Sequence, residues 1–96
     1  MESREKTRYR GRLRIWADVL HVVKAEGAAK PTRILYGANL SHERLTKYLD
    51  ELEAKGLLRH VDEGERSTYS LTPEGEAFLG EYARLKRFTD AFGLEL

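Results

Sequence analysis

Cysteine is absent from this 96-residue chain, proline occurs twice, and methionine and tryptophan occur once each. Without cysteine the protein can form no disulfide, no thiolate metal site and no thiol nucleophile. No apolar run approaches the roughly 20 residues of a membrane-spanning helix, and the charged stretch from Met1 to Arg14 lacks the apolar core of a signal peptide. We therefore expect a cytoplasmic protein with no membrane partner.

Patterns that would indicate catalysis or metal binding are also missing from the sequence. His21, His42 and His60 fall on three different predicted elements, without the spacing that a metal site requires. The carboxylates of residues 50–53 are interpreted as one helix surface, and neither a paired nucleophile nor a glycine-rich phosphate loop accompanies them. We expect no catalytic residue, no metal and no cofactor, and hence no enzyme.

What the chain does have is an uneven distribution of charge. The formal net charge is +1, but residues 1–48 hold eleven Lys or Arg against five Asp or Glu, whereas residues 49–96 hold six against eleven. A basic first half suits binding to a polyanion, and the alternative is two ordinary solvated surfaces. We interpret residues 1–8 as a basic flexible arm, either following nucleic acid or simply solvated. Six cations occupy alternating positions in the first fourteen residues of the chain: Arg4, Lys6, Arg8, Arg10, Arg12 and Arg14.

Apolar spacing predicts three helices in the next part of the chain. The first runs roughly from Tyr9 to Glu26, with Trp16 on its buried stripe. Pro31 opens a short second helix, because proline is tolerated in a first turn. Ser41 is the predicted N-cap of a third helix that ends at Gly56, a residue suited to a left-handed backbone conformation.

A β-hairpin and a last helix complete the predicted order. Residues 57–61 and 67–71 indicate two strands around a hairpin tip at 62–66, and Thr72 followed by Pro73 restarts a helix. The fold class is therefore mainly α with a small β-hairpin: a winged helix-turn-helix with a long C-terminal dimerisation helix. We assign residues 9–72 to a winged helix-turn-helix DNA-binding domain and 73–96 to the dimerisation helix.

The third helix is the candidate DNA-binding element. A projecting helix fits the major groove, its N-terminus favours a phosphate, and Arg44 and Lys47 fall on its polar side. The predicted contact set is Lys30, Thr32, Arg33, Asn39, Ser41, His42, Arg44, Lys47 and Arg66. Whether the wing contacts DNA stays open at this point, because Asp62, Glu63 and Glu65 at its tip would repel phosphate.

The last helix has a heptad-like apolar seam. Phe78, Tyr82, Leu85, Thr89 and Phe92 follow one another at steps of four and three. Unless something covers them, the large side chains of this seam would remain in water. We expect a second copy of the chain to cover them, with folding back onto the first helix as the alternative. The candidate dimerisation residues are Phe78, Tyr82, Leu85, Phe88 and Phe92.

The runs P-T-R-I-L-Y-G-A-N-L-S from Pro31 to Ser41, G-L-L from Gly56 and L-T-P-E-G from Leu71 carry a resemblance. They resemble the small archaeal winged-helix DNA-binding proteins. That resemblance implies a dimer joined by a C-terminal antiparallel coiled coil, and a chromatin-associated (nucleoid) or regulatory role. The acidic wing tip departs from it, and so does Gly80, which we expect to interrupt the last helix and shorten the coil.

These observations favour a transcriptional regulator or nucleoid-associated protein that binds double-stranded DNA as a homodimer. Two alternatives remain. One is a winged-helix interaction module of a larger transcription or chromatin assembly, and the other is single-strand or RNA binding through the basic arm.

Overall fold

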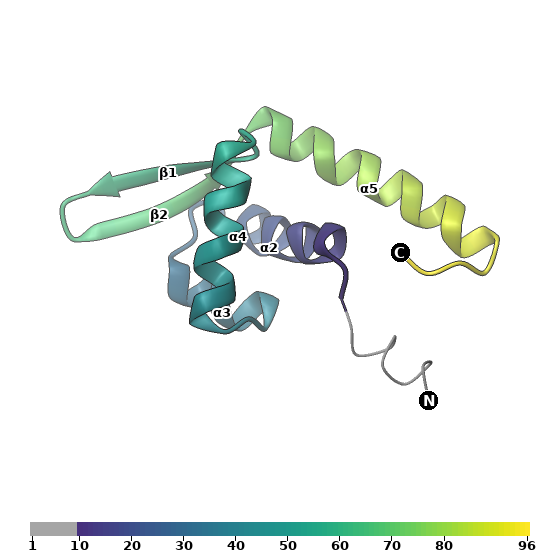
Figure 1. Cartoon of the computed structure of the whole chain (residues 1–96). Helices are drawn as coiled ribbons and strands as arrows, with labels where there is room; N and C mark the ends of the chain where they lie inside the picture. The colour runs from purple at the N-terminus through teal and green to yellow at the C-terminus, as the bar shows by residue number, and fades with distance from the viewer. Residues whose placement is uncertain (1–9) are drawn as a thin grey trace.

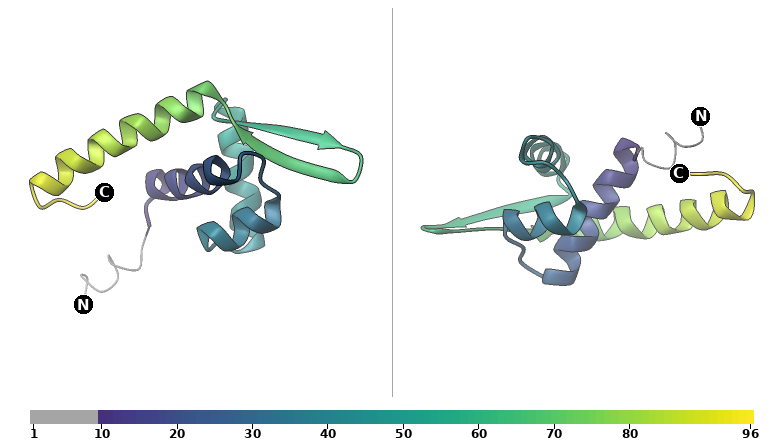
Figure 2. Two further views of the ribbon diagram at one scale, coloured as in Figure 1. Left: turned by 180° about the vertical axis from the view of Figure 1, so that it is seen from behind. Right: turned by 90° about the horizontal axis from the view of Figure 1, so that it is seen from below.

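The computed structural model describes residues 10–96 as three helices, a two-stranded wing and a long last helix. The elements are α2 (Arg12–Glu26), α3 (Pro31–Ala38), α4 (His42–Ala54), β1 (Leu58–Glu63), β2 (Arg66–Leu71) and α5 (Pro73–Ala91). In Figure 1, α4 crosses in front of α2, with α3 beneath it. The wing and α5 leave this group in opposite directions, as both views of Figure 2 also show. The predicted fold class is confirmed.

The core lies where the three helices meet the base of the wing. Its fully buried side chains include Ile15 and Leu20 of α2, Ile34 of α3 and Leu52 of α4. Removing such side chains from water is the main favourable term in folding, at about 25 cal/mol per Å² of apolar surface. The wing and α5 contribute Leu58, Tyr69 and Leu79 to the same cluster.

Short-range signals set the starts and ends of the helices. The Ser41 hydroxyl accepts a hydrogen bond from the Arg44 amide at 3.2 Å, which caps α4. Gly56 follows the end of α4 with a φ of 77°, the left-handed conformation expected of it. The Thr72 hydroxyl caps α5 by accepting from the Gly75 amide, and it also donates to the Gly56 carbonyl. These three predictions are confirmed.

The wing is an antiparallel ribbon tied to the loop between α2 and α3. Its register pairs Leu58 with Leu71 at the base and Glu63 with Arg66 at the tip. Ala29 and Tyr69 exchange two backbone hydrogen bonds of 2.8 and 2.9 Å, so this loop pairs with β2 through an isolated antiparallel β-bridge. Both strands reach further toward the tip than predicted, because Asp62 pairs with Ser67 and Glu63 with Arg66.

Three further expectations need correction. The first helix starts at Arg12 rather than Tyr9, because Gly11 is its extended N-cap and Arg10 lies outside it. Trp16 is only partly buried at the edge of the core. Gly80 does not interrupt α5, which runs unbroken for 19 residues, since a glycine inside a helix costs only about 1 kcal/mol relative to alanine. The predicted arm, residues 1–8, lies outside the described part of the chain.

After α5 the chain turns back on itself. Gly93 has a φ of 72°, and the Leu94 amide donates to the Thr89 carbonyl at 2.8 Å. This turn leaves Thr89 only 8% exposed, although it lies at the far end of the helix. No helix between residues 10 and 96 is long and apolar enough to cross a membrane.

Candidate nucleic-acid interface

The face of α4 that points away from the core carries the two cations expected to meet DNA. Arg44 and Lys47 are exposed, whereas Leu45, Tyr48, Leu49 and Leu52 of the same helix are buried. The cationic groups of Arg44 and Lys47 lie 5.9 and 5.4 Å from the centre of the Tyr48 ring. Such cation–π contacts contribute about 0.5–1 kcal/mol at exposed sites. Tyr48 therefore supports both cations on the surface of the helix.

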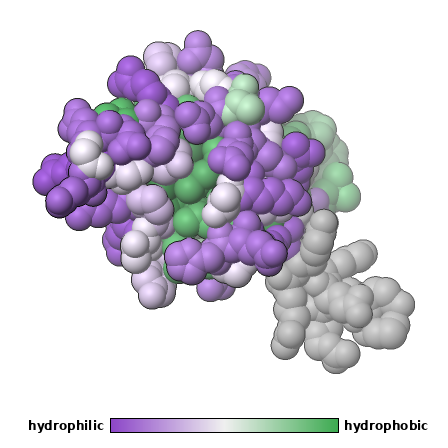
Figure 3. Space-filling view, turned by 60° about the vertical axis from the view of Figure 1, so that its left-hand side comes forward, coloured by the Kyte–Doolittle hydropathy of each residue, from purple (hydrophilic) through white to green (hydrophobic). Residues whose placement is uncertain are grey.

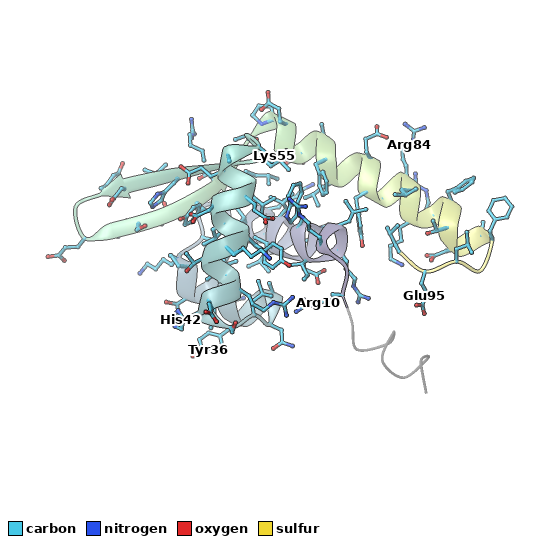
Figure 4. The ribbon with its side chains drawn as sticks, viewed as in Figure 1. Arg10, Tyr36, His42, Lys55, Arg84 and Glu95 are labelled. Carbon is cyan, nitrogen blue, oxygen red and sulfur yellow. The ribbon has the colours of Figure 1, made fainter. Side chains whose placement is uncertain are left out.

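The start of α4 is open to solvent. Ser41 and His42 are exposed, and Figure 4 shows His42 at the end of α4 that lies beside α3, near Tyr36. Thr46 uses its hydroxyl proton to bond the His42 carbonyl at 3.0 Å, so toward a ligand it offers only an acceptor. The positive end of the helix dipole and the cations Arg44 and Lys47 thus lie in the same half of α4.

The rest of α4 is acidic. Between His42 and Ala54 the helix holds Arg44 and Lys47 as its cations, against the carboxylates of Glu43, Asp50, Glu51 and Glu53. Attraction to a polyanion must therefore come from the N-terminal half of α4 together with neighbouring elements, because the helix as a whole carries no positive charge.

Those neighbouring elements are the start of α3 and the wing. Lys30, Thr32 and Arg66 line an open hollow of about 570 Å³ together with Pro31, Ser67, Glu63 and Glu65. Figure 3 turns the wing side of the molecule forward and shows mostly hydrophilic side chains on either side of a narrow strip of hydrophobic residues. The two glutamates offset the two cations of the hollow, as the acidic wing tip led us to expect.

Arg33 and Asn39 of the predicted contact set also have roles within the protein. Arg33 pairs with Glu26 of α2 at 3.0 Å and stays 63% exposed, so its charge is partly compensated. Asn39 is the left-handed C-cap of α3, with a φ of 57° and a ψ of 59°. Its side chain is exposed, but its backbone serves the turn between α3 and α4.

Sequence reasoning missed a cluster that joins α4 to α2. Glu51 accepts hydrogen bonds from the Trp16 indole at 3.0 Å and from Arg12 at 3.3 Å. The Trp16 hydrogen bond, followed by the nearby charge of Arg12, holds the pKa of Glu51 below its ordinary value despite partial burial. Trp16 in turn packs against Phe78 of α5. The chain's one tryptophan therefore touches both α4 and α5, which no local pattern predicts.

The predicted dimerisation residues fall into two groups on α5. Phe78 and Tyr82 are half-buried and stack on each other beside Trp16, with the Trp16 and Phe78 rings 5.9 Å apart. Leu85, Phe88 and Phe92 are 41, 59 and 66% exposed. The Phe88 and Phe92 rings contact each other, with centroids 4.9 Å apart. The alternative of folding back onto α2 therefore holds for the first group alone.

Among residues 10–96 no three His, Asp or Glu side chains gather in a way that could hold a metal ion. His21 is exposed on α2, His42 is at the start of α4, and His60 is on the wing. His60 stacks on Tyr69 and bonds to the Ser67 hydroxyl at 2.7 Å. These roles are structural or solvent-facing.

The fold and the site together define a winged helix-turn-helix protein. The sequence pattern of the winged helix-turn-helix family matches residues 9–90, and the chain belongs to that family. It is similar to Sso10a-2, a DNA-binding protein from Sulfolobus solfataricus. The TM-score is 0.78 at 28% identity, over 86% of this chain and 85% of that one.

Two other relatives widen the comparison. BpsR of Bordetella bronchiseptica shares the fold with a TM-score of 0.72 at 19% identity, over 80% of this chain and 58% of its own. An uncharacterized protein of Methanocaldococcus jannaschii is 33% identical over 58 residues. That match spans 60% of this chain and 59% of the relative, less than two thirds of its length. The predicted resemblance to small archaeal winged-helix proteins is confirmed.

Proposed function

We propose that this protein is a non-enzymatic regulator or nucleoid-associated protein that binds duplex DNA by inserting α4 into the major groove. The observation that carries the proposal is the pair Arg44 and Lys47, both exposed on a capped helix and both resting on the Tyr48 ring. A helix that projects in this way matches the width of the groove, and its N-terminal residues would meet the base edges. The described DNA binding of Sso10a-2 supports the same function.

Lys30, Thr32 and Arg66 are proposed to hold the backbone of the DNA beside the groove. They surround the hollow between α3 and the wing, and phosphate contacts of this kind fix the register of a protein on a duplex. Glu63 and Glu65 in the same hollow keep the wing tip away from phosphate. We therefore expect Arg66, the first residue of β2, to be the only residue of the wing tip that contacts DNA.

A homodimer joined through α5 would complete the site. The exposed Leu85, Phe88 and Phe92 form an apolar stripe at the end of α5 that is far from α4. Two copies that pair through this stripe with twofold symmetry present two recognition helices to one duplex, and such helices bind half-sites about 34 Å apart. Such a dimer would cover the two phenylalanine rings that a monomer leaves in water.

Binding to random duplex DNA, followed by fluorescence anisotropy, tests the proposal. Arg44→Ala and Lys47→Ala are each expected to weaken binding by roughly tenfold, since single contacts to DNA contribute about 1–3 kcal/mol. Arg84→Ala is the matched control, because Arg84 is 70% exposed on α5 and pairs only with Glu81 in the described part of the chain. Unchanged affinity in a variant that carries both Arg44→Ala and Lys47→Ala would contradict the proposal.

The second candidate is an interaction module that docks onto a basic protein of a transcription or chromatin assembly. The acidic character of α4 favours it, because Glu43, Asp50 and Glu53 are exposed on the same helix. This alternative predicts no binding to duplex at moderate salt. It also predicts that Asp50→Asn, rather than Arg44→Ala, abolishes the interaction with the partner.

A further inference from the structure

Arg10 reaches from the start of α2 to the far end of α3. Its Nη1 atom donates to the Ala38 carbonyl at 2.7 Å and to the Asp18 carboxylate at 2.9 Å, and Nη2 donates to the Asn39 carbonyl at 2.9 Å. The side chain is only 20% exposed. Figure 4 shows Arg10 near the lower end of the molecule, where α3 and the start of α4 also lie.

The two carbonyls that Arg10 binds are those of Ala38, the last residue of α3, and of Asn39, its C-cap. The last carbonyls of a helix have no amide to accept from, and a cation at that end also complements the helix dipole. α3 has no basic residue in its own last turn. Arg10, 28 residues earlier in the sequence, supplies the missing donors and the missing charge.

The bound segment is the turn of the helix-turn-helix. Asn39 is the only described non-glycine residue with positive φ, a conformation that most side chains disfavour. Leu40 follows with 7% exposure, and its amide bonds back to the Leu35 carbonyl at 3.0 Å. Ser41, the N-cap of α4, comes next. Two residues therefore separate the Ala38–Asn39 turn bound by Arg10 from the first residue of the recognition helix.

We propose that Arg10 is a positioning residue of the DNA-binding site. It fixes the turn between α3 and α4, and through Asp18 it fixes that turn to α2, so that α4 projects at the angle the groove requires. The proposal rests on the proposed function and deepens it. It also gives Arg10 a role that its place among the alternating cations of the N-terminus did not indicate.

The salt dependence of binding separates a positioning residue from a residue that touches DNA. Each phosphate contact adds about 0.9 to the slope of log affinity against log salt. A variant that loses a phosphate contact therefore binds with a shallower slope. A variant whose recognition helix is poorly held binds more weakly at every salt concentration, while its slope stays close to the wild-type slope.

The experiment compares Arg10→Ala, Arg10→Lys and the matched control Arg14→Ala on one random duplex at several salt concentrations, at a temperature where circular dichroism shows every variant folded. Arg14 is exposed and belongs to the same series of cations. We expect Arg10→Ala to bind at least tenfold more weakly with an unchanged slope. Arg10→Lys should recover only part of that loss, because an ammonium group cannot bind both carbonyls and the carboxylate in the geometry of a guanidinium. Arg14→Ala should lose less than threefold.

Two results would overturn the assignment. A slope lowered by about one in Arg10→Ala would make Arg10 a phosphate contact, and an unchanged affinity in the folded variant would leave it a purely structural residue.

Amide hydrogen exchange of the free protein tests the turn without DNA. In Arg10→Ala the amides of Leu40 and Arg44 should exchange at least tenfold faster, while the Tyr69 amide, bonded to Ala29, should not change. If the wild-type protein does not bind duplex DNA, the proposed function fails and exchange still decides whether Arg10 holds the turn. Equal exchange in both proteins would overturn that role.

Discussion

The two halves of α5 meet different surroundings. From Pro73 to Tyr82 the helix lies on its own domain, where Leu79 is 4% exposed and Phe78 packs against Trp16. The second half of α5 projects past α2 (Figure 2), and Phe88 and Phe92 are 59 and 66% exposed. One helix thus stabilises the domain with its first half and offers apolar surface with its second. An apolar seam in a sequence identifies residues that need cover, but it does not tell whether the cover comes from the same chain.

The largest expected effect concerns the exposed half of the helix. Phe88→Ser combined with Phe92→Ser should weaken self-association by more than about 1000-fold, on the order of 4 kcal/mol, because buried aromatic rings dominate interface energies. Sedimentation velocity at tens of micromolar should change from dimer to monomer. Arg87→Ser, on the same stretch of α5, is the control and should stay dimeric. A wild-type protein that sediments as a monomer would contradict the dimer.

The buried half should respond in the stability of the folded chain instead. Leu79→Ala is expected to cost about 2–5 kcal/mol of unfolding free energy, since it opens a cavity beneath α5. Leu85→Ala removes the same atoms from a side chain that is 41% exposed, and should cost much less. Urea denaturation of both variants at a concentration where the protein is monomeric measures the contrast. Equal losses would show that the two halves are not distinct.

Glycine substitutions sharpen the same comparison. A Cβ atom at Gly75 would overlap the Leu57 carbonyl and the Leu71 side chain, so Gly75→Ala should lose about 1–3 kcal/mol by overpacking. A Cβ atom at Gly80 meets nothing within 4 Å, and Gly80→Ala should gain roughly 0.5–1 kcal/mol from helix propensity. Thermal denaturation would detect both shifts. A destabilised Gly80→Ala variant would mean that this part of α5 has a close neighbour in the folded protein.

The smallest expected effect is the change in stability at low pH that comes from Glu51 in the cluster joining α4 to α2. Because the pKa of Glu51 is lowered in the folded protein, its contribution to stability is present above the ordinary glutamate pKa of about 4.3 and is lost as the pH falls through the lowered value. Glu51→Gln keeps an acceptor for the Trp16 indole but has no charge to lose. The variant should therefore lose less stability than the wild type between pH 7 and pH 3.5 in urea titrations. Parallel losses would contradict the assigned role of Glu51.

Local signals made most of the fold predictable. The Ser41 and Thr72 caps, the proline at the start of α3 and the left-handed Gly56 act within one helical turn, so a single sequence contains all the information they need. The same holds for the exposure of Arg44 and Lys47, which follows from the apolar stripe on the opposite side of α4.

Contacts between distant residues were not predictable in the same way. Arg10 binds carbonyls 28 and 29 residues away, and Glu51 binds a tryptophan 35 residues away. Backbone carbonyls carry no side-chain signal, and an arginine in a basic stretch is first interpreted as a nucleic-acid contact. The predicted interruption at Gly80 was wrong although Gly80 is a local signal, because the neighbouring turns of α5 outweigh the small cost of one glycine.

The most direct test of the central claim is amide hydrogen exchange of the wild-type protein with and without a duplex of random sequence. The account predicts added protection in the first half of α4, at the start of α3 and at Arg66, with none at Glu63 or Glu65. Protection confined to the C-terminal half of α4, or none anywhere in the presence of duplex, would contradict insertion of α4 into DNA.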